Sequence, residues 1–156
     1  MRFRVRDAVP EDVQGVRELV GQHWRVNLDY SQELKNRDAV FLVAVSGGSS
    51  RRSQGTPLGV ALMWVTRWNR TGYLAELAVD KAHRRKGVGS RLLAELASKA
   101  RSRRLRAIIV ETQPDCRVAV AFYLRSGLRL CGYNDRYYTN EPRDPHQIAI
   151  FFSLDL

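Results

Sequence analysis

Cysteine is scarce in this sequence, and the shortage limits the chemistry that the chain can support. The 156 residues include two cysteines, Cys116 and Cys131, and neither has a second Cys or a His at metal-ligand spacing. This argues against a zinc site and against a disulfide framework, because both need several ligating or pairing side chains. We therefore expect no bound metal and two inert thiols.

Long hydrophobic runs and clustered histidines are absent as well. No apolar stretch approaches the ~20 residues of a membrane-spanning helix, and residues 1–6 alternate as a strand does instead of carrying the apolar core of a signal peptide. These features predict a cytoplasmic protein without a membrane partner. The histidines His23, His83 and His146 are scattered along the chain, and we assign them no role.

The length and composition suit one domain that spans residues 1–156. Hydrophobic residues make up 44% of the chain, which is enough to fill a core. Residues 46–57 are rich in Ser and Gly and predict a poorly ordered hairpin loop. This loop does not mark a domain boundary, because the strands on either side of it would pair with each other.

One stretch combines a buried strand, a basic glycine turn and the start of a helix. Leu77, Ala78 and Val79 form a short apolar run typical of a buried strand, and the apolar residues of 92–100 recur at helical spacing. A helix N-terminus presents unpaired N–H groups and the positive end of its dipole, which favours an anion. The turn therefore predicts a phosphate site, formed by Arg84, Arg85, Lys86, Gly87, Val88, Gly89 and Ser90.

The side chains of this turn suit phosphate, although a plain surface turn would explain them equally well when they are taken alone. Gly87 and Gly89 lack a Cβ and let a ligand approach the backbone, while arginine can grip phosphate with two N–H groups. A Walker-type loop is excluded because no Gly-Lys-Ser/Thr occurs. A dinucleotide-binding turn is excluded because the third glycine is missing.

The pattern Arg84-x-x-Gly87-x-Gly89, after a strand and at the opening of an amphipathic helix, resembles a known family motif. It is the pyrophosphate motif Gln/Arg-x-x-Gly-x-Gly/Ala of the GCN5-related N-acetyltransferases, the GNAT family. The resemblance implies acetyl-CoA as the acetyl donor, with its pantetheine arm paired to backbone groups of Leu77, Ala78 and Val79. One of their N–H groups could also bind the thioester oxygen as negative charge develops on it.

A second motif of the same family lies further along. Members commonly carry Asn-x-x-Ala-x-x-x-Tyr-x-x-x-Gly-Phe, and here the chain reads Cys116-Arg-Val-Ala119-Val-Ala-Phe-Tyr123-Leu-Arg-Ser-Gly127-Leu128. Cys116 replaces Asn, which weakens the case for a side-chain contact to pantetheine, but we keep Cys116 as a candidate contact. The tyrosine is retained. The resemblance covers nearly the whole chain and is strongest over residues 74–154.

A narrower likeness concerns the acceptor. Residues 111–113, 131–135 and 147–154 resemble streptothricin acetyltransferases, which acetylate an amine of a small cationic antibiotic. The glutamate at 111 and the tyrosine at 123 also resemble those of ribosomal-protein N-terminal acetyltransferases. We expect a primary amine on a small molecule as acceptor, with a protein N-terminus as the alternative. A non-catalytic module that binds acyl-CoA or RNA is the rival class, because a fold alone does not establish activity.

The formal charge of +10 comes from 26 Lys and Arg against 16 Asp and Glu. The basic residues cluster at 51–52, at 84–86 and at 101–106. The second cluster is explained by phosphate, and the third lies near the end of the main helix, where cations favour the dipole. We favour a solvated face over a nucleic-acid or ribosome-surface role, because no aromatic residues interleave with these clusters as they do in single-strand binders.

The expected chemistry needs a base and an acid. An aliphatic ammonium has a pKa near 10, so about one molecule in a thousand is neutral and nucleophilic at pH 7. Glu111 or Glu76 could collect the proton, and the resemblance places Tyr123 where its phenol protonates the leaving thiolate. Each glutamate could instead be a solvent-facing or ion-paired strand residue, and Tyr123 could be a core ring.

The region before the second strand covers the acceptor pocket in the GNAT fold. Trp24, Asn27 and Tyr30 could line that pocket, although aromatic residues at helical spacing are more often core, and we favour core. Glu33, Asp135 and Glu141 are available to offset the positive surface for a cationic acceptor.

The fold class that follows is α/β, with a mixed sheet of about seven strands flanked by about four helices. Strands are expected near residues 3–5, 39–45, 58–64, 74–79, 107–112, 128–133 and 148–154. The β-α-β-α-β order predicts antiparallel strands in the first half and parallel strands in the second half, around the cofactor. The oligomeric state is left open, a homodimer being one option.

Overall fold

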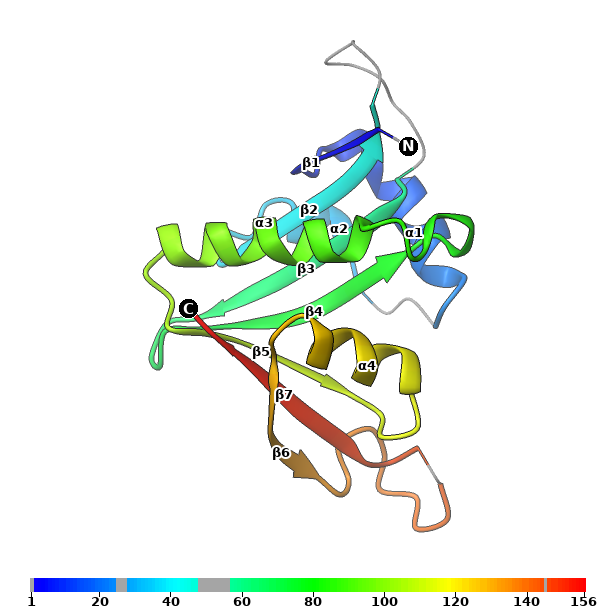
Figure 1. Cartoon of the computed structure of the whole chain (residues 1–156), viewed down its shortest axis with the longest axis vertical. Helices are drawn as coiled ribbons and strands as arrows, with labels where there is room; N and C mark the ends of the chain where they lie inside the picture. Colours follow the sequence, from blue (N-terminus) through cyan, green and yellow to red (C-terminus); the bar gives the residue numbers. More distant parts are fainter. Residues whose placement is uncertain (1, 25–27, 48–56, 145) are drawn as a thin grey trace.

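One mixed sheet runs through the computed structural model, which describes residues 2–24, 28–47, 57–144 and 146–156. Its strands are β1 (Phe3–Asp7), β2 (Ala39–Ser46), β3 (Gly59–Thr66), β4 (Thr71–Val79), β5 (Ala107–Thr112), β6 (Arg129–Asn134) and β7 (Ala149–Asp155). Across the sheet they follow the order β1-β2-β3-β4-β5-β7-β6 (Figure 1). This confirms the predicted α/β fold with seven strands.

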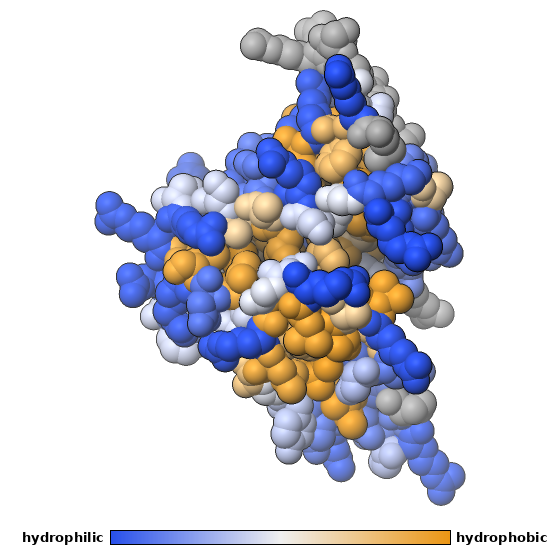
Figure 2. Space-filling view, viewed as in Figure 1, coloured by the Kyte–Doolittle hydropathy of each residue, from blue (hydrophilic) through white to orange (hydrophobic). Residues whose placement is uncertain are grey.

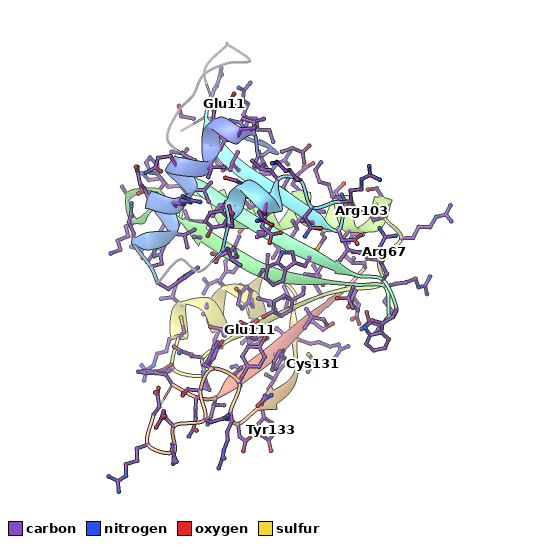
Figure 3. All side chains as sticks on the ribbon, turned by 180° about the vertical axis from the view of Figure 1, so that it is seen from behind. Glu11, Arg67, Arg103, Glu111, Cys131 and Tyr133 are labelled. Carbon is purple, nitrogen blue, oxygen red and sulfur yellow. The ribbon has the colours of Figure 1, made fainter. Side chains whose placement is uncertain are left out.

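Helices cover both faces of this sheet. They are α1 (Val13–Gly21), α2 (Tyr30–Glu33), α3 (Val88–Ser102) and α4 (Arg117–Arg125). In Figure 1, α3 and α4 lie in front of the sheet, and the opposite view of Figure 3 brings α1 and α2 to the front. The number of helices agrees with the prediction.

Strand β2 separates two hydrophobic cores. Val40, Leu42 and Ala44 face the core under α3 and α4, and the residues between them face the core under α1 and α2. Successive side chains of a strand point to opposite faces, so a continuous apolar run fills both cores at once. The apolar composition of residues 39–45 therefore accounts for the burial of β2 on both sides.

Helix α4 is less deeply packed than α3. Tyr123 is its buried residue, whereas Val118 and Leu124 are exposed. In Figure 2, apolar side chains gather over the part of this face where α4 lies. The helix is thus packed on the sheet through the ring of Tyr123 together with the partly buried Ala119, Val120 and Phe122.

The prediction of parallel strands is confirmed for one pair and wrong for two. Strand β4 pairs with β5 in parallel, whereas β7 pairs antiparallel with both β5 and β6. The prediction assumed that β6 would lie beside β5 after the α4 crossover. Instead the C-terminal strand β7 inserts between them, so β6 points the same way as β5 without being its neighbour.

Two expectations concern residues that the structure does not describe. Asn27 lies outside the described residues, and so does most of the loop expected between β2 and β3, at residues 48–56. Within the described ranges, no helix is long and apolar enough to cross a membrane.

Candidate active site

The central strands separate at the place where the glycine turn begins. Strand β4 pairs with β5 only over Thr71–Tyr73, opposite Ala107–Ile109. Beyond this, residues 74–79 and 110–112 continue without pairing to each other. The N–H and C=O groups on that edge of β4 are therefore open to an extended ligand, as at any unpaired strand edge. Leu77, Ala78 and Val79 lie on this open edge.

A bulge in β4 redirects the side chains that follow it. Leu62 of β3 pairs with Glu76 and Met63 pairs with Leu74, so Ala75 is an extra residue in β4. Leu74 packs in the core under α3, whereas Ala75 and Ala78 pack in the core under α1 and α2. A bulge re-aims side chains in this way. It turns Glu76 toward α1 and α2, at the start of the open edge.

The turn before α3 leaves several N–H groups unused. Gly87 precedes the helix with φ +82°, and the first backbone hydrogen bond runs from Arg91 N–H to the Gly87 carbonyl at 2.9 Å. The N–H groups of Val88, Gly89 and Ser90 come before that bond, so they have no acceptor within the helix. Apart from its two neighbours in the chain, no described residue has an atom within 4 Å of the position that a Cβ on Gly87 would take. The turn thus combines unpaired donors with open space at Gly87.

Gly89 has a different role in the same turn. A Cβ on Gly89 would lie 3.3 Å from Cε2 of Phe122 in α4. The missing side chain therefore leaves room for the Phe122 ring of α4 beside the start of α3.

Two of the three basic side chains of the turn are fixed by local contacts. Arg84 donates from Nε to the Val79 carbonyl at 3.4 Å, and the Lys86 ammonium donates to the Ala82 carbonyl at 2.9 Å. Arg85 is exposed, with φ +56°, and its side chain contacts no polar partner in the described part of the chain. The positive charge is therefore held at the helix N-terminus and exposed to solvent.

His23 contacts this turn although the sequence assigned it no role. Its Nδ1 lies 2.8 Å from Nη2 of Arg84. Burial, and then the charge of Arg84, lower the pKa of His23, so the neutral imidazole accepts a hydrogen bond from the guanidinium. His23 thus links the end of α1 to the first residue of the phosphate motif.

Glu76 is a buried carboxyl group beside the open edge. It is 7% exposed, and Trp24 donates from Nε1 to its Oε1 at 3.3 Å. Burial, with a smaller contribution from the charge of Glu111, raises the pKa of Glu76 to about 7, against the opposing effect of the Trp24 hydrogen bond. Oε2 of Glu76 and the hydroxyl of Tyr30 are both buried, and neither makes a hydrogen bond of ordinary geometry among the described residues. The Tyr30 hydroxyl nevertheless lies close enough to Glu76 to lower the pKa of that carboxyl group, so the two groups interact with each other.

The expected pocket residues differ in their surroundings. Tyr30 is completely buried in the core under α1 and α2, as favoured from the sequence. Its hydroxyl is buried too and makes no hydrogen bond of ordinary geometry with the described residues. Trp24 is 46% exposed and covers Glu76 instead of filling the core.

Glu111 lies on the same face, held by tyrosines that the sequence did not indicate. The Tyr73 hydroxyl donates to Glu111 and also lies 2.8 Å from the Tyr137 hydroxyl. Tyr73 stacks on Trp64 with ring centroids 5.9 Å apart, and Trp64 donates from Nε1 to Glu33 at 2.9 Å. Figure 3 shows Glu111 on the face turned to the viewer, the one with α1 and α2. Acidic and aromatic groups thus alternate along this face.

Tyr123 approaches the opening from the α3 and α4 side. It is 7% exposed, and its ring packs beside Phe122 and Phe152 with centroids 5.5 and 5.7 Å away. Burial, and then the charges of Glu111 and Cys116, raise the pKa of the phenol. Its hydroxyl makes no hydrogen bond to any residue that the structure describes. The O–H is therefore protonated and free to donate to a ligand.

The remaining candidates make no hydrogen bond to Glu76, Glu111 or Tyr123 in the described structure, apart from the indirect link of Glu33 to Tyr73 described above. Cys116 is exposed at the start of α4, and its thiol is free. Asp135 and Glu141, which were expected to offset the positive surface, are exposed. Glu33 is the member of that set which joins the aromatic face, through Trp64.

Comparison with known proteins adds a family match. The profile described as the Acetyltransferase (GNAT) family matches residues 11–128. An uncharacterized protein of Mycobacterium leprae (strain TN) is 40% identical over 70 residues, which is 45% of this chain. The match spans about a fifth, 19%, of that protein's length.

Solved structures with the same fold include two acetyltransferases. A Bacillus anthracis protein, provisionally assigned as a streptothricin acetyltransferase and solved with acetyl coenzyme A, has a TM-score of 0.73 at 24% identity. The similarity covers 83% of this chain and 69% of that one. The ribosomal-protein-S18-alanine N-acetyltransferase of Escherichia coli has a TM-score of 0.79 at 16% identity, over 99% and 94% of the two chains.

Proposed function

This chain belongs to the GNAT family of acetyltransferases, and we propose that it transfers an acetyl group from acetyl-CoA to a primary amine of a small molecule. Residues 1–156 act as one acetyltransferase domain in this proposal. The observation that carries it is the open edge of β4, which runs from Glu76 to the turn that leads into Gly87. A single extended donor can therefore have its phosphates at the turn and its thioester beside the carboxyl group.

The residues of the turn fit the phosphates of acetyl-CoA. The N–H groups of Val88, Gly89 and Ser90 have no acceptor within the helix, the backbone at Gly87 borders open space, and an anion at this helix N-terminus gains from the helix dipole. Arg84, Arg85 and Lys86 add charge from the side chains. Leu77, Ala78 and Val79 pair with β3 on one edge, and the groups on their other edge, which has no strand beside it, are the candidates to pair with the pantetheine arm. Cys116 lies at the start of α4 as a further candidate contact.

Glu76 is the proposed base. The acceptor nitrogen must lose a proton before its lone pair attacks the thioester carbon, and a carboxylate with a pKa of about 7 is half ionised near neutral pH. Its Oε2 is buried and makes no hydrogen bond of ordinary geometry in the described structure, so that oxygen keeps lone pairs that can take a proton. Glu111 is the alternative base, but it already accepts a hydrogen bond from Tyr73. As the carbon–sulfur bond breaks, the O–H of Tyr123 donates to sulfur.

Replacing Glu76 with glutamine should change the pH dependence of turnover. We expect wild-type kcat/KM to rise through pH about 7 as Glu76 ionises, and the Glu76→Gln variant to lose that rise with about tenfold lower activity. The factor is modest because Glu111 or water can still take the proton. If Glu76→Gln and Glu111→Gln both keep the wild-type profile, the base is solvent.

The same substitution also tests the raised pKa of Glu76 through the pH dependence of protein stability, independently of catalysis. The folded pKa of Glu76, about 7, exceeds its ordinary value of 4.5, so the stability linked to the proton is complete below pH 4.5 and is lost as pH rises through 7. We therefore expect the Tm of the wild type to fall relative to the Tm of Glu76→Gln as the pH rises from 4.5 through 7. The exposed Glu141→Gln variant serves as control and should follow the wild type at every pH.

Acidic and aromatic groups support a cationic acceptor. The protein carries a net charge of +10, which repels a cation at long range, so a cationic amine needs local attraction. Glu33, Glu76 and Glu111 supply it on one face, and the rings of Trp64 and Tyr73 can contact a cation directly. The second candidate acceptor is a protein N-terminus, as the name of the Escherichia coli relative indicates for that enzyme.

An amine panel tests the proposed function. We expect thiol release from acetyl-CoA with small cationic amines, drawn from polyamines, aminoglycosides and streptothricin, at a higher kcat/KM than with peptide N-termini. A clear preference for a peptide would support the second candidate. No thiol release with any amine would contradict the proposal and favour a non-catalytic module.

A further inference from the structure

The end of the sheet far from the phosphate turn carries a dense group of arginines around an exposed tryptophan. These exposed residues come from three loops and, for Arg101, from the last turn of α3: Arg37, Arg67, Trp68, Arg70, Arg101, Arg103, Arg104 and Arg106. They are termed the arginine–tryptophan patch below. Its seven arginines are a large share of the 26 basic residues in the chain.

Hydrogen bonds fix the three loops to one another. Arg106 donates from Nε to the Asn69 carbonyl and from its backbone N–H to the Arg70 carbonyl, both at 2.8 Å. Arg103 donates from Nη1 to the Arg37 carbonyl at 3.3 Å. Figure 3 shows Arg103 and Arg67 at the same end of the molecule. The patch is therefore one continuous surface assembled by the fold.

Much of its charge is free to meet a ligand. The side chains of Arg70, Arg101 and Arg104 make no polar contact within the described residues. Asp38 neutralises Arg67, with Arg67 Nε 2.8 Å from Asp38 Oδ1, and Asp155 lies 3.4 Å from Arg129. The acidic side chains near the patch are therefore already paired, and the remaining charge is positive.

Two arginines of the patch have a left-handed backbone conformation. Arg70 has φ +54° and Arg104 has φ +58°. Non-glycine residues adopt this region at an energetic cost, and such residues cluster where the surrounding structure serves a function. Arg70 lies in the turn before β4, and Arg104 lies in the turn after α3. The hydrogen bonds of Arg106 join these two turns.

Trp68 is the aromatic member of the patch. Its side chain is 86% exposed, so it adds almost nothing to either core. The arginines at 67 and 70 flank it in sequence, and the contacts of Arg106 bring the 101–106 cluster beside its turn. The basic cluster at 101–106 contains no aromatic residue. The fold places Trp68, more than thirty residues away in the sequence, beside it.

We propose that the arginine–tryptophan patch binds single-stranded nucleic acid. Phosphates would contact the free guanidinium groups, and an unpaired base would stack on Trp68, the combination that single-strand binders use. An anionic membrane surface fits less well, because interfacial binding needs a broad apolar face and the patch offers one apolar ring. This inference does not depend on which amine the enzyme acetylates.

The patch and the phosphate turn lie at opposite ends of β4. The strand starts at Thr71, next to the patch, and ends at Val79, next to the turn. Its 9 residues span roughly 26 Å at about 3.3 Å per residue. Nucleic acid on the patch therefore leaves the acetyl-transfer site open, so binding and turnover can be measured separately.

Fluorescence anisotropy with a labelled single-stranded RNA of mixed sequence tests this. We expect the Kd to rise with NaCl in a log–log plot whose slope reflects the phosphates contacted, about 0.7 per phosphate. The double variant Arg101→Glu/Arg104→Glu should bind at least about tenfold more weakly, with a shallower slope. Trp68→Ala should also lose about tenfold in affinity, because base stacking is lost. Acetyl transfer should stay unchanged in both.

A matched control isolates the patch from net charge. Arg125→Glu/Arg143→Glu makes the same change in charge at exposed positions elsewhere and should keep the wild-type slope. Equal loss in the two double variants would overturn the proposal, as would wild-type binding by Trp68→Ala. A DNA probe of the same sequence shows whether the sugar matters. Tighter binding to anionic lipid vesicles than to either probe, abolished by Trp68→Ala, would overturn the proposal in favour of a membrane surface.

Discussion

Replacing Gly87 with leucine should abolish acetyl-CoA binding while leaving the protein folded. Gly87 has φ +82° before the first turn of α3, and the space where its Cβ would lie contains no atom within 4 Å. A leucine side chain there would extend into this space at the start of the helix, next to residues whose N–H groups have no acceptor within the helix. The phosphates would then lose both the donors and the room to approach them. Isothermal titration calorimetry with acetyl-CoA measures this directly.

Gly127 provides a control with the same backbone strain. It has φ +84° after α4, and no atom lies within 4 Å of its missing Cβ. Leucine at either position should lower the free energy of unfolding by about 1–2 kcal/mol, because a left-handed backbone is unfavourable for a residue with a Cβ. Thermal unfolding should show the same loss of stability in both variants, and only Gly87→Leu should lose acetyl-CoA binding. Wild-type affinity in Gly87→Leu would mean that the phosphates bind elsewhere.

The order of strand, turn and helix at the proposed phosphate site could be predicted because its signals are local. A short apolar strand, two glycines and a helical pattern occur within one stretch, and the structure shows β4, the turn and α3 in that order. Hydrophobic spacing and glycine positions act over a few residues, so they can be recognised from the sequence alone. The seven strands and four helices were predicted for the same reason.

Contacts between distant segments could not be predicted. His23 and Arg84 are 61 residues apart, and Tyr73 and Glu111 are 38 apart. Nothing in the local sequence links such pairs, because they meet only when the sheet has formed. The extra residue Ala75 is a similar case, since a bulge depends on how β3 and β4 pair and not on β4 alone. The bulge nevertheless determines where Glu76 points.

The strand order shows the same limit in the second half of the sheet. Apolar residues at 148–154 predicted a strand but not its neighbours. Strand β7 lies between β5 and β6, pairing Glu111 with Phe151. This insertion brings the segment before β7 toward Glu111, and Tyr137 from that segment contacts Tyr73. The tyrosines around Glu111 were therefore not visible as a group until the strand order was known.

Tyr123→Phe should lower kcat by about 100-fold or more while acetyl-CoA binding changes little. The substitution keeps the ring, which packs between Phe122 and Phe152, and removes only the hydroxyl. That hydroxyl has no hydrogen-bond partner in the described structure, so its loss leaves no buried group unpaired and the fold should be retained. Single-turnover kinetics and calorimetry separate the chemical step from binding.

The expected loss of kcat arises because the departing thiolate needs a proton. When the carbon–sulfur bond breaks, negative charge develops on sulfur, and a nearby O–H stabilises it and supplies the proton. Burial, with the charges of Glu111 and Cys116, raises the pKa of Tyr123, so the phenol stays protonated at any pH at which Glu76 ionises. Phenylalanine cannot donate. Tyr133→Phe, at a ring that is 76% exposed on β6, controls for the loss of a hydroxyl and should turn over at the wild-type rate. A wild-type rate in Tyr123→Phe as well would show that another group protonates the thiolate.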